Sequence, residues 1–333
     1  MALGSRRAGA ADRRLGRIDR HRRCRLGIWR ARIAGVDAAI ARGPTLRIGI
    51  VQTNLGVQEK GISPERAHDR YLEQTRALLA GGPVDLIVWP ETAYRAGLHG
   101  PLPISGELVR DDVSVPLLFG ASFVRTDTGP RVAYNAALLI DADGMIRDVY
   151  SKNLLIPFTE YVPLAGLVPW LTSRFHRPSH FAASKQVPPL VLGSWRIATP
   201  IGYEAVRPAF VRRMVLEGQP QLLVALADDA WFGTSQEPGL HLAMASLRAV
   251  EHRRSLVRAT NSGISAVIDP AGREVARTGL LTRENLRASV VLLDETTLYT
   301  RWGDWFGWLC AVIVIGALIN PLRRWGQGYA LPP

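Results

Sequence analysis

A glutamate and a lysine each stand at the end of a predicted strand, where a side chain can leave the sheet and reach a substrate. Glu91 follows the apolar run of residues 84–89 and is preceded by Pro90, so its carboxylate should emerge at a sheet edge in a position suited to a general base. Lys152 ends the return strand of a predicted hairpin, where its ammonium could stabilise an oxyanion beside that base. Only three of the 41 basic residues are lysines, which indicates that a compact charge is needed at this position.

Four segments, in this order along the chain, resemble the motifs of the nitrilase superfamily and in particular those of the bacterial apolipoprotein N-acyltransferase family. They are Val88–Ala93 (VWPETA), Tyr150–Pro163 (YSKNLLIPFTEYVP), Ala198–Glu204 (ATPIGYE) and Asp228–Gly233 (DDAWFG), the last followed by Arg258–Ile264 (RATNSGI). The resemblance implies an α/β fold, a nitrilase-type α-β-β-α sandwich. It also implies transfer of a fatty acyl group from a phospholipid to the N-terminal amine of a diacylglyceryl-Cys lipoprotein.

The same resemblance assigns roles to single residues. Glu91 would be the general base, Lys152 would stabilise the oxyanion, and Glu160 would be the supporting carboxylate that orients one of the two. Glu204 would hold the loops around the site by hydrogen bonds. Trp231 and Phe232 would either line the acyl pocket or pack in the core, and neither alternative is favoured.

Position 202 departs from the family, which has a nucleophilic cysteine there. Gly202 has no side chain, so it cannot form a thioester with an acyl group. The nearest hydroxyls, on Thr199 and Tyr203, are expected to point in other directions along a strand or tight elbow. Two smaller departures are Thr159, where the family has glycine, and Asp228, where it has asparagine. We therefore expect the inherited acyl transfer to be lost or altered.

Three hypotheses remain for the function. The chain could be a catalytically dead member that retains lipid or lipoprotein binding. It could be an acyltransferase with altered chemistry, in which Glu91 activates an amine or water directly. It could also be an amidase of the wider superfamily, which the C-terminal apolar segment disfavours. The implied partners are a phospholipid donor, a lipoprotein acceptor and a membrane. No organic cofactor or metal is predicted, because neither Cys24 nor Cys310 belongs to a metal-binding cluster.

The elements that must position these residues follow from the pattern of apolar residues. The predicted strands are residues 45–51, 84–89, 115–122, 132–140, 145–150, 221–227, 258–269 and 287–293. The predicted helices are residues 64–80, 208–217 and 241–254. Arg248, Arg253 and Arg254 are expected on a solvated helix face. Apolar strands mixed with helices imply sheets that are covered by helices.

The basic N-terminal arm, residues 1–43, differs from the body of the chain. It contains twelve arginines, no lysine and three aspartates, and so carries +9 of the net charge of +12. We expect this arm to be disordered and not to bind nucleic acid, because no aromatic interleaving or nucleic-acid motif accompanies the charge. Residues 44–300 are the expected nitrilase-like domain.

Residues 303–322 are predicted to form a transmembrane helix, because residues 305–322 carry no charge and would span about 27 Å as a helix. Tryptophans crowd one end of this run, and the short basic tail of residues 323–333 follows the other, as in a helix with a cytoplasmic flank. The nitrilase-like domain would then lie on the outer, periplasmic face of a bacterial inner membrane. The family usually carries a polytopic membrane region before its catalytic domain, so we expect that this chain is a truncated or divergent member or that its true start lies elsewhere.

Overall fold

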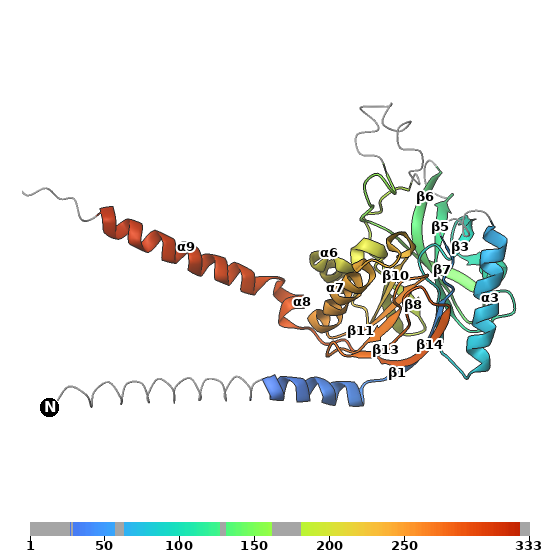
Figure 1. The fold of residues 1–333 in the computed structure, drawn as a ribbon, viewed down its shortest axis with the longest axis horizontal. Helices are drawn as coiled ribbons and strands as arrows, with labels where there is room; N and C mark the ends of the chain where they lie inside the picture. Colours follow the sequence, from blue (N-terminus) through green and yellow to red (C-terminus); the bar gives the residue numbers. More distant parts are fainter. Residues whose placement is uncertain (1–26, 28, 57–62, 127–130, 162–180, 327–333) are drawn as a thin grey trace, which may run out of the picture.

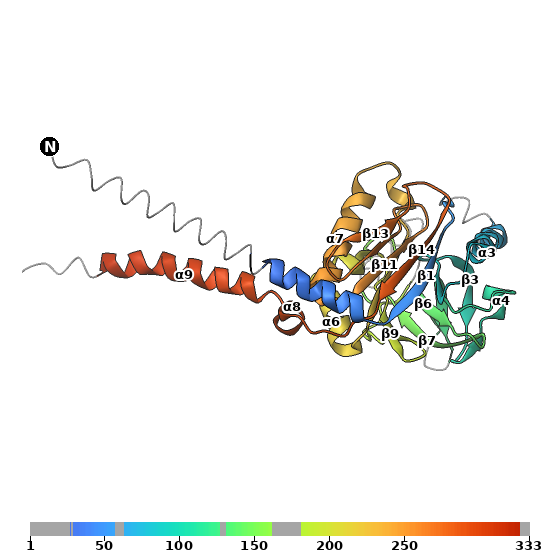
Figure 2. The same ribbon diagram turned by 90° about the horizontal axis from the view of Figure 1, so that it is seen from below.

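The computed structural model describes residues 27, 29–56, 63–126, 131–161 and 181–326, and the side chains of these residues as far as residue 319 (Figure 1). Most of the predicted basic arm lies outside the described residues. Residues 29–42 of that arm are helical, which corrects the prediction that the whole arm is disordered. This helix and the C-terminal helix extend from the same side of the folded body (Figure 2).

Two β-sheets lie face to face. The first has the order β14-β1-β2-β5-β6-β7-β4, with β3 paired to β5, and the second has the order β13-β12-β11-β10-β9-β8. The strands of the first sheet are β1 (Thr45–Gln52), β2 (Leu86–Val88), β3 (Tyr94–His99), β4 (Ile104–Ser105), β5 (Leu117–Arg125), β6 (Val132–Ile140), β7 (Met145–Ser151) and β14 (Glu284–Val291). The strands of the second are β8 (Leu190–Leu192), β9 (Trp195–Ala198), β10 (Leu222–Ala227), β11 (Ser255–Thr260), β12 (Ala266–Ile268) and β13 (Glu274–Arg277).

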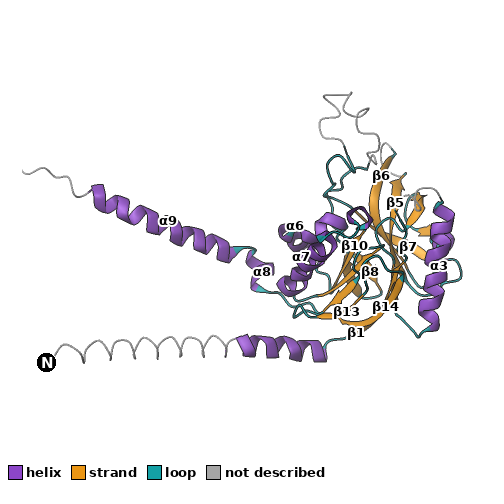
Figure 3. Ribbon diagram, in the orientation of Figure 1, coloured by secondary structure: helices purple, strands orange, loops and turns teal. Residues whose placement is uncertain are grey.

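Helices cover the outer face of each sheet, so the predicted α-β-β-α order of layers is confirmed (Figures 1 and 3). Helix α3 (Pro64–Ala80) lies on the first sheet, and α6 (Pro208–Gly218) and α7 (Glu237–His252) lie on the second. The shorter elements are α4 (Glu107–Arg110), η1 (Gly202–Val206), η2 (Ala230–Phe232) and α8 (Leu298–Trp302), and the last helix is α9 (Trp305–Gly326).

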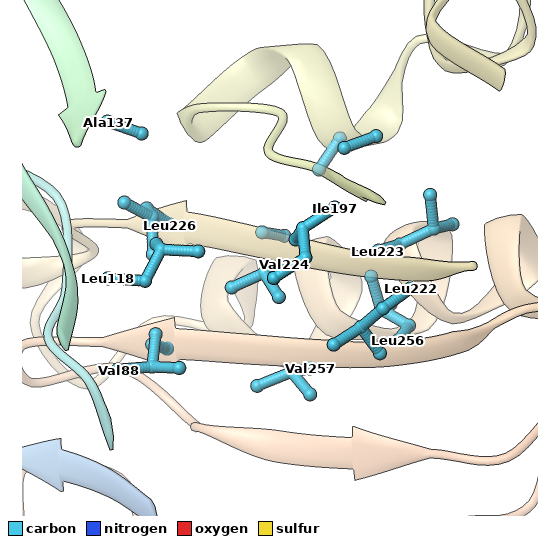
Figure 4. Packing of buried hydrophobic residues seen from close by; sticks show 14 of the residues in the cluster. Val88, Leu118, Ala137, Ile197, Leu222, Leu223, Val224, Leu226, Leu256 and Val257 are labelled. Atoms are coloured by element: carbon cyan, nitrogen blue, oxygen red, sulfur yellow. The ribbon is translucent and has the colours of Figure 1, made fainter. Parts of the chain in front are cut away.

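The core between the sheets explains why the central strands read as continuous apolar runs. All six residues of β10 are buried, because this strand pairs in parallel with both β9 and β11 and is covered on two faces. Val88 and Leu118 of the first sheet belong to the same buried cluster as Val224, Leu226 and Val257 of the second (Figure 4). The carboxyl ends of the parallel strands in both sheets are held in fixed positions by this packing.

The predicted transmembrane helix of residues 303–322 is not confirmed. Within the described part of the chain, no helix meets the length and apolarity needed to cross a bilayer. Helix α9 projects away from the sandwich (Figures 1 and 2), and its large apolar side chains between Trp305 and Ile319 are exposed.

Polar side chains of α6 and α7 fasten α8, and with it the start of α9, to the body. Arg212 of α6 donates from Nε to the carbonyl oxygens of Tyr299 and Thr300 and from Nη2 to that of Arg301. His252, the last residue of α7, is fully buried and shares a 2.8 Å hydrogen bond between Nδ1 and Oγ1 of Thr300. The carbonyl groups at the end of α8 are therefore satisfied by a cation, as the helix dipole favours.

Two arginines beside this junction correct the prediction of a solvated face. Arg248 and Arg254 are buried, and Arg254 donates to the carbonyl oxygens of Pro220 and Glu295. Burial and, to a lesser degree, the positive charges of Arg248, Arg254 and Arg212 lower the pKa of His252 to about 3.

Acid should weaken the fold through His252. Its pKa falls from 6.5 to about 3 on folding, so its contribution to stability is complete above pH 6.5 and is lost as the pH falls toward 3. Between these limits the free energy of unfolding should decrease by up to about 1.4 kcal/mol per pH unit more than in His252→Asn, which can keep the Thr300 contact but cannot titrate. Urea unfolding across this pH range measures the difference. Parallel curves for the two proteins would contradict the assignment.

Candidate active site

Three residues from separate parts of the chain meet at one end of the sandwich. Glu91 follows β2, Lys152 follows β7, and Gly202 opens η1 after β9. The Lys152 Nζ atom lies 3.1 Å from Glu91 Oε1. A Cβ atom placed on Gly202 would lie 3.2 Å from Glu91 Oε2 and 3.3 Å from Lys152 Nζ. The predicted base and the predicted cation thus both face the position where the family carries its nucleophile.

The backbone around Glu91 is fixed by close packing with the next strand. Trp89 is buried, stacks on Tyr71 and donates from Nε1 to Thr75 Oγ1 at 2.9 Å. Gly120 of β5 lies so near the loop that a Cβ atom on it would be 2.7 Å from Glu91 Cα. Glycine at position 120 is therefore required for Glu91 to reach the site, a role that the sequence analysis missed.

Lys152 is buried between two carboxylates. Its side chain is 1% exposed, and Nζ lies 2.9 Å from Glu160 Oε1 in addition to the contact with Glu91. Burial alone would lower the pKa of Lys152, but the charges of Glu91 and Glu160 outweigh burial and raise this pKa above its ordinary value. The lysine is therefore a fixed cation at neutral pH, as oxyanion stabilisation requires.

An asparagine that sequence reasoning missed connects the two carboxylates. Asn135 Nδ2, from β6, donates to Glu91 Oε1 at 2.7 Å and to Glu160 Oε1 at 2.9 Å. Glu160 Oε2 in turn accepts from the backbone N–H of Ile156 at 2.9 Å. These contacts use Glu91 Oε1, and they leave Oε2 as the oxygen that faces Gly202.

The turn at Gly202 between β9 and η1, which we call the elbow, has a backbone conformation that favours glycine. Its φ is +54°, a left-handed value that costs a residue with a side chain roughly 1–2 kcal/mol. The chain turns here from β9 into η1, and the Gly202 carbonyl oxygen lies 3.3 Å from Nε2 of the buried His241 on α7. The turn is thus held from behind by a side chain of α7.

Glu204 joins the elbow to the lysine segment. This fully buried carboxylate accepts from the N–H groups of Ile201, Asn153 and Leu154 and from the Tyr150 hydroxyl, over 2.6–2.9 Å. Burial raises the pKa of Glu204 above its ordinary value, and the four hydrogen bonds oppose that effect. Glu204 therefore links the elbow to the segment after Lys152 by hydrogen bonds.

A cavity of about 480 Å³ opens beside the site. It is lined by Asn153, Leu154, Leu155, Tyr161, Phe181, Ala183, Tyr203 and Arg207. A larger cavity, of about 760 Å³, lies near the amino end of β9 among Asp85, Asp148 and Trp195. We assign the smaller cavity to the site, because residues next in sequence to Lys152 and Gly202 line it.

The two predicted pocket aromatics lie at the surface. Trp231 is 69% exposed and Phe232 is 44% exposed, so neither packs in the core. Neither lines the 480 Å³ cavity among its described residues. Their contact with an acyl chain stays a prediction.

Among the described residues, one group of side chains could hold a metal ion. Asp229, Glu237 and His241 lie together behind the elbow. The sequence analysis missed this group because Asp229 is separated from the other two by the turn after η2. Glu237 and His241 are four residues apart in a helix and so lie on the same face. This spacing is the sequence signal that could have revealed two of the three residues.

The fold and the meeting of a glutamate and a lysine at an elbow define a protein of the nitrilase superfamily. The carbon-nitrogen hydrolase family model matches residues 112–297. The chain belongs to the carbon-nitrogen hydrolase family.

Solved structures agree with this fold. Saccharomyces cerevisiae Nit3, a member of branch 10 of the nitrilase superfamily, matches with a TM-score of 0.56 and 17% identity, over 74% of this chain and 90% of that chain. A carbon-nitrogen hydrolase from Helicobacter pylori G27 matches with a TM-score of 0.54 and 16% identity, over 74% and 89%. At these identities the likeness shows the fold alone.

Curated relatives share more of the sequence. The apolipoprotein N-acyltransferase of Pseudomonas syringae pv. tomato is 36% identical over 299 residues, which are 85% of this chain and 58% of the relative. The protein of the same name from Gloeobacter violaceus is 35% identical, over 86% of this chain and 55% of the relative. The chain thus spans little more than half the length of these relatives.

Glu204→Gln should destabilise the protein by about 2–4 kcal/mol, because an amide in place of the carboxylate turns one acceptor oxygen into a donor that faces buried N–H groups. Urea unfolding measures the loss. The matched control is Glu217→Gln, which removes an exposed ion pair with Arg213 and should cost no more than about 0.5 kcal/mol. Equal losses in the two variants would refute the proposed role of Glu204.

Proposed function

We propose that this chain is an apolipoprotein N-acyltransferase-like protein that binds an acyl donor but does not form a covalent acyl-enzyme. The observation that carries the proposal is the position of Gly202. A Cβ atom there would lie within 3.3 Å of both the carboxylate of Glu91 and the ammonium of Lys152. The groups that serve a nucleophile are present and correctly directed, whereas residue 202 supplies no sulfur or oxygen.

A thiol at position 202 would use each of these groups. Its sulfur would attack the ester carbonyl carbon of a phospholipid while its proton passes to Glu91 Oε2. Lys152 would face the oxyanion, and the departing alcohol would take the proton back from Glu91 as the thioester forms. An acceptor amine would then attack the thioester and pass a proton to Glu91, the C–S bond would break as the amide forms, and the released thiolate would take that proton back. With glycine, Glu91 can activate only a diffusing amine or water, and the two-step division of the barrier is lost.

The substrate class follows from the relatives and from the cavity. The relatives are named apolipoprotein N-acyltransferases, and a lipoprotein amine with a phospholipid donor fits that name. Leu154, Leu155 and Phe181 give the cavity beside the site an apolar lining that suits an acyl chain. Trp231 and Phe232 are exposed, and their contact with such a chain is part of the proposal.

Retained binding without turnover is therefore the form of this function that we favour. Direct transfer to an amine or water is the second candidate, because Glu91 Oε2 faces the space in front of Gly202. An amidase activity has weaker support, since the relatives that are 35–36% identical to this chain are named apolipoprotein N-acyltransferases.

We also place the protein at a membrane surface, at the outer face of a bacterial inner membrane as the relatives' role suggests. The support is the exposed apolar surface of α9. Val312, Ile313, Val314 and Ile315 are consecutive in the helix, so they point in all directions around it, and all four are exposed. A helix that is apolar on every side needs an apolar environment.

Gly202→Cys should restore covalent acylation. Intact-mass spectrometry after incubation with phospholipid vesicles should show one acyl adduct on this variant and none on the wild-type chain or on Gly202→Ala. Both substitutions place a side chain at φ +54°, so each should lower the free energy of unfolding by about 1–2 kcal/mol. Adding Glu91→Gln to Gly202→Cys should slow acylation about 10²–10⁴-fold.

Two outcomes would overturn the proposal. An acyl adduct near the elbow of the wild-type chain would show that another nucleophile acts there. A folded Gly202→Cys variant that gains no adduct would show that Glu91 and Lys152 do not serve a thiol. Fatty acid or acylated amine formed by the wild-type chain without any adduct would favour direct transfer over binding alone.

The membrane proposal predicts that the chain partitions into phospholipid vesicles through α9. The emission of its tryptophans should shift to the blue on binding. Val312→Asp should lower partitioning about tenfold or more, because a charge in the apolar part of a bilayer costs about 2.5–3.5 kcal/mol. The control is Val275→Asp, which places the same charge at an exposed position of β13, outside α9. Equal binding of both variants would exclude α9 as the contact.

A further inference from the structure

Three potential metal ligands converge behind the elbow. Asp229 directly precedes η2, and Glu237 and His241 lie one turn apart at the start of α7. One ligand atom from each residue lies within 4.8 Å of the others. We propose that Asp229, Glu237 and His241 form a binding site for a divalent metal ion of the zinc type. The proposal is independent of acyl transfer.

The distances favour a metal ion over hydrogen bonds. His241 Nδ1 lies 3.4 Å from Asp229 Oδ1 and 3.6 Å from Glu237 Oε1. Hydrogen bonds from nitrogen to oxygen are most often about 2.7–3.2 Å long, so both separations are longer than in a typical hydrogen bond. Two ligands of a tetrahedral ion, each at about 2.0–2.2 Å from it, are about 3.3–3.6 Å apart. The two separations from His241 Nδ1 match that arrangement.

Two buried atoms in the group have no hydrogen-bond partner. They are Nδ1 of His241 and Oε2 of Glu237. The His241 side chain is only 9% exposed, so water does not readily satisfy Nδ1. Leaving a buried polar atom unsatisfied costs about 1–3 kcal/mol. A metal ion that accepts the lone pair of Nδ1 would remove this cost.

The surrounding contacts are those of a metal-binding histidine and carboxylate. His241 Nε2 faces the carbonyl oxygen of Gly202 at 3.3 Å. With the proton on Nε2, the neutral ring directs the lone pair of Nδ1 at the carboxylates, and ligating histidines are commonly oriented in this way. Asp229 Oδ2 is held by Arg258 at 2.8 Å, which leaves Oδ1 for the ion.

The net charge of the group favours binding of a cation. Arg258 neutralises one of the two carboxylates, so the group keeps one negative charge while His241 is neutral. One imidazole nitrogen and two carboxylates form a donor set suited to Zn²⁺.

A metal ion here would act on the elbow through His241. It would fasten the loop after β10 to α7, and the ring bonded to it would hold the Gly202 carbonyl group. The ion would therefore have a structural role at the turn that presents residue 202, and none of its ligands needs to touch the substrate.

The test is a titration of the chelator-treated full chain with Zn²⁺. Calorimetry should show one ion bound per chain, and Zn²⁺ in excess should raise the unfolding temperature. Co²⁺ should give the visible absorption of a tetrahedral nitrogen and oxygen site. Glu237→Gln alters a ligand that is partly exposed, so this variant should fold, and it should weaken Zn²⁺ binding about tenfold or more. Glu217→Gln, an exposed carboxylate on the neighbouring α6, should leave binding unchanged.

Three results would overturn the site. They are no Zn²⁺ binding, binding that Glu237→Gln leaves as tight as in the wild type, and nitrogen NMR shifts that show both ring nitrogens of His241 protonated in the presence of Zn²⁺. The last result would mean that a proton, and not a metal ion, bridges the imidazole and the two carboxylates.

Discussion

The buried ammonium of Lys152 is the constraint on which the site depends. A lysine that is 1% exposed is stable only beside opposite charge, and here Glu91 and Glu160 both supply it. The two carboxylates come from segments on either side of the lysine in sequence, and Asn135 holds both by one amide group. Removing any one member would leave a buried charge or donor unpaired. The charged part of the site therefore persists as a structural unit even though residue 202 carries no nucleophile.

The elbow is joined to that unit by buried hydrogen bonds, and no covalent chemistry is needed to keep it in place. Glu204 accepts from Ile201 on one side and from Asn153 and Leu154 on the other. His241 faces the carbonyl oxygen of Gly202 from behind. The turn is thus fixed by residues 201, 204 and 241, and its geometry does not depend on the side chain at 202. This explains how a site can lose its nucleophile and keep the rest of its arrangement.

Local patterns predicted the elements well, and contacts between distant segments escaped them. The apolar run of residues 45–51 became β1, and the helix predicted from Pro64 ends at Ala80, before the Gly81-Gly82 pair. The strand β3 was missed because Gly97 interrupts its pattern of apolar residues. Its buried and exposed residues also alternate only in part. Arg248 was predicted to be solvated because nothing in α7 itself shows that α8 packs nearby. Asn135 and Gly120 have no motif of their own, since their roles arise only where β5 and β6 pass beside Glu91.

The backbone at position 202 gives a physical reason why glycine is tolerated there. A φ of +54° is unfavourable for cysteine by roughly 1–2 kcal/mol, and a Cβ atom would lie only 3.2–3.3 Å from Glu91 and Lys152. A nucleophile at this turn is therefore held against backbone strain and close contacts, as is common where strain serves catalysis. Glycine removes both costs, so the substitution that abolishes the thioester also relaxes the fold. If the chain acts by binding alone, as proposed, glycine at position 202 favours the stability of the turn without a cost to that function.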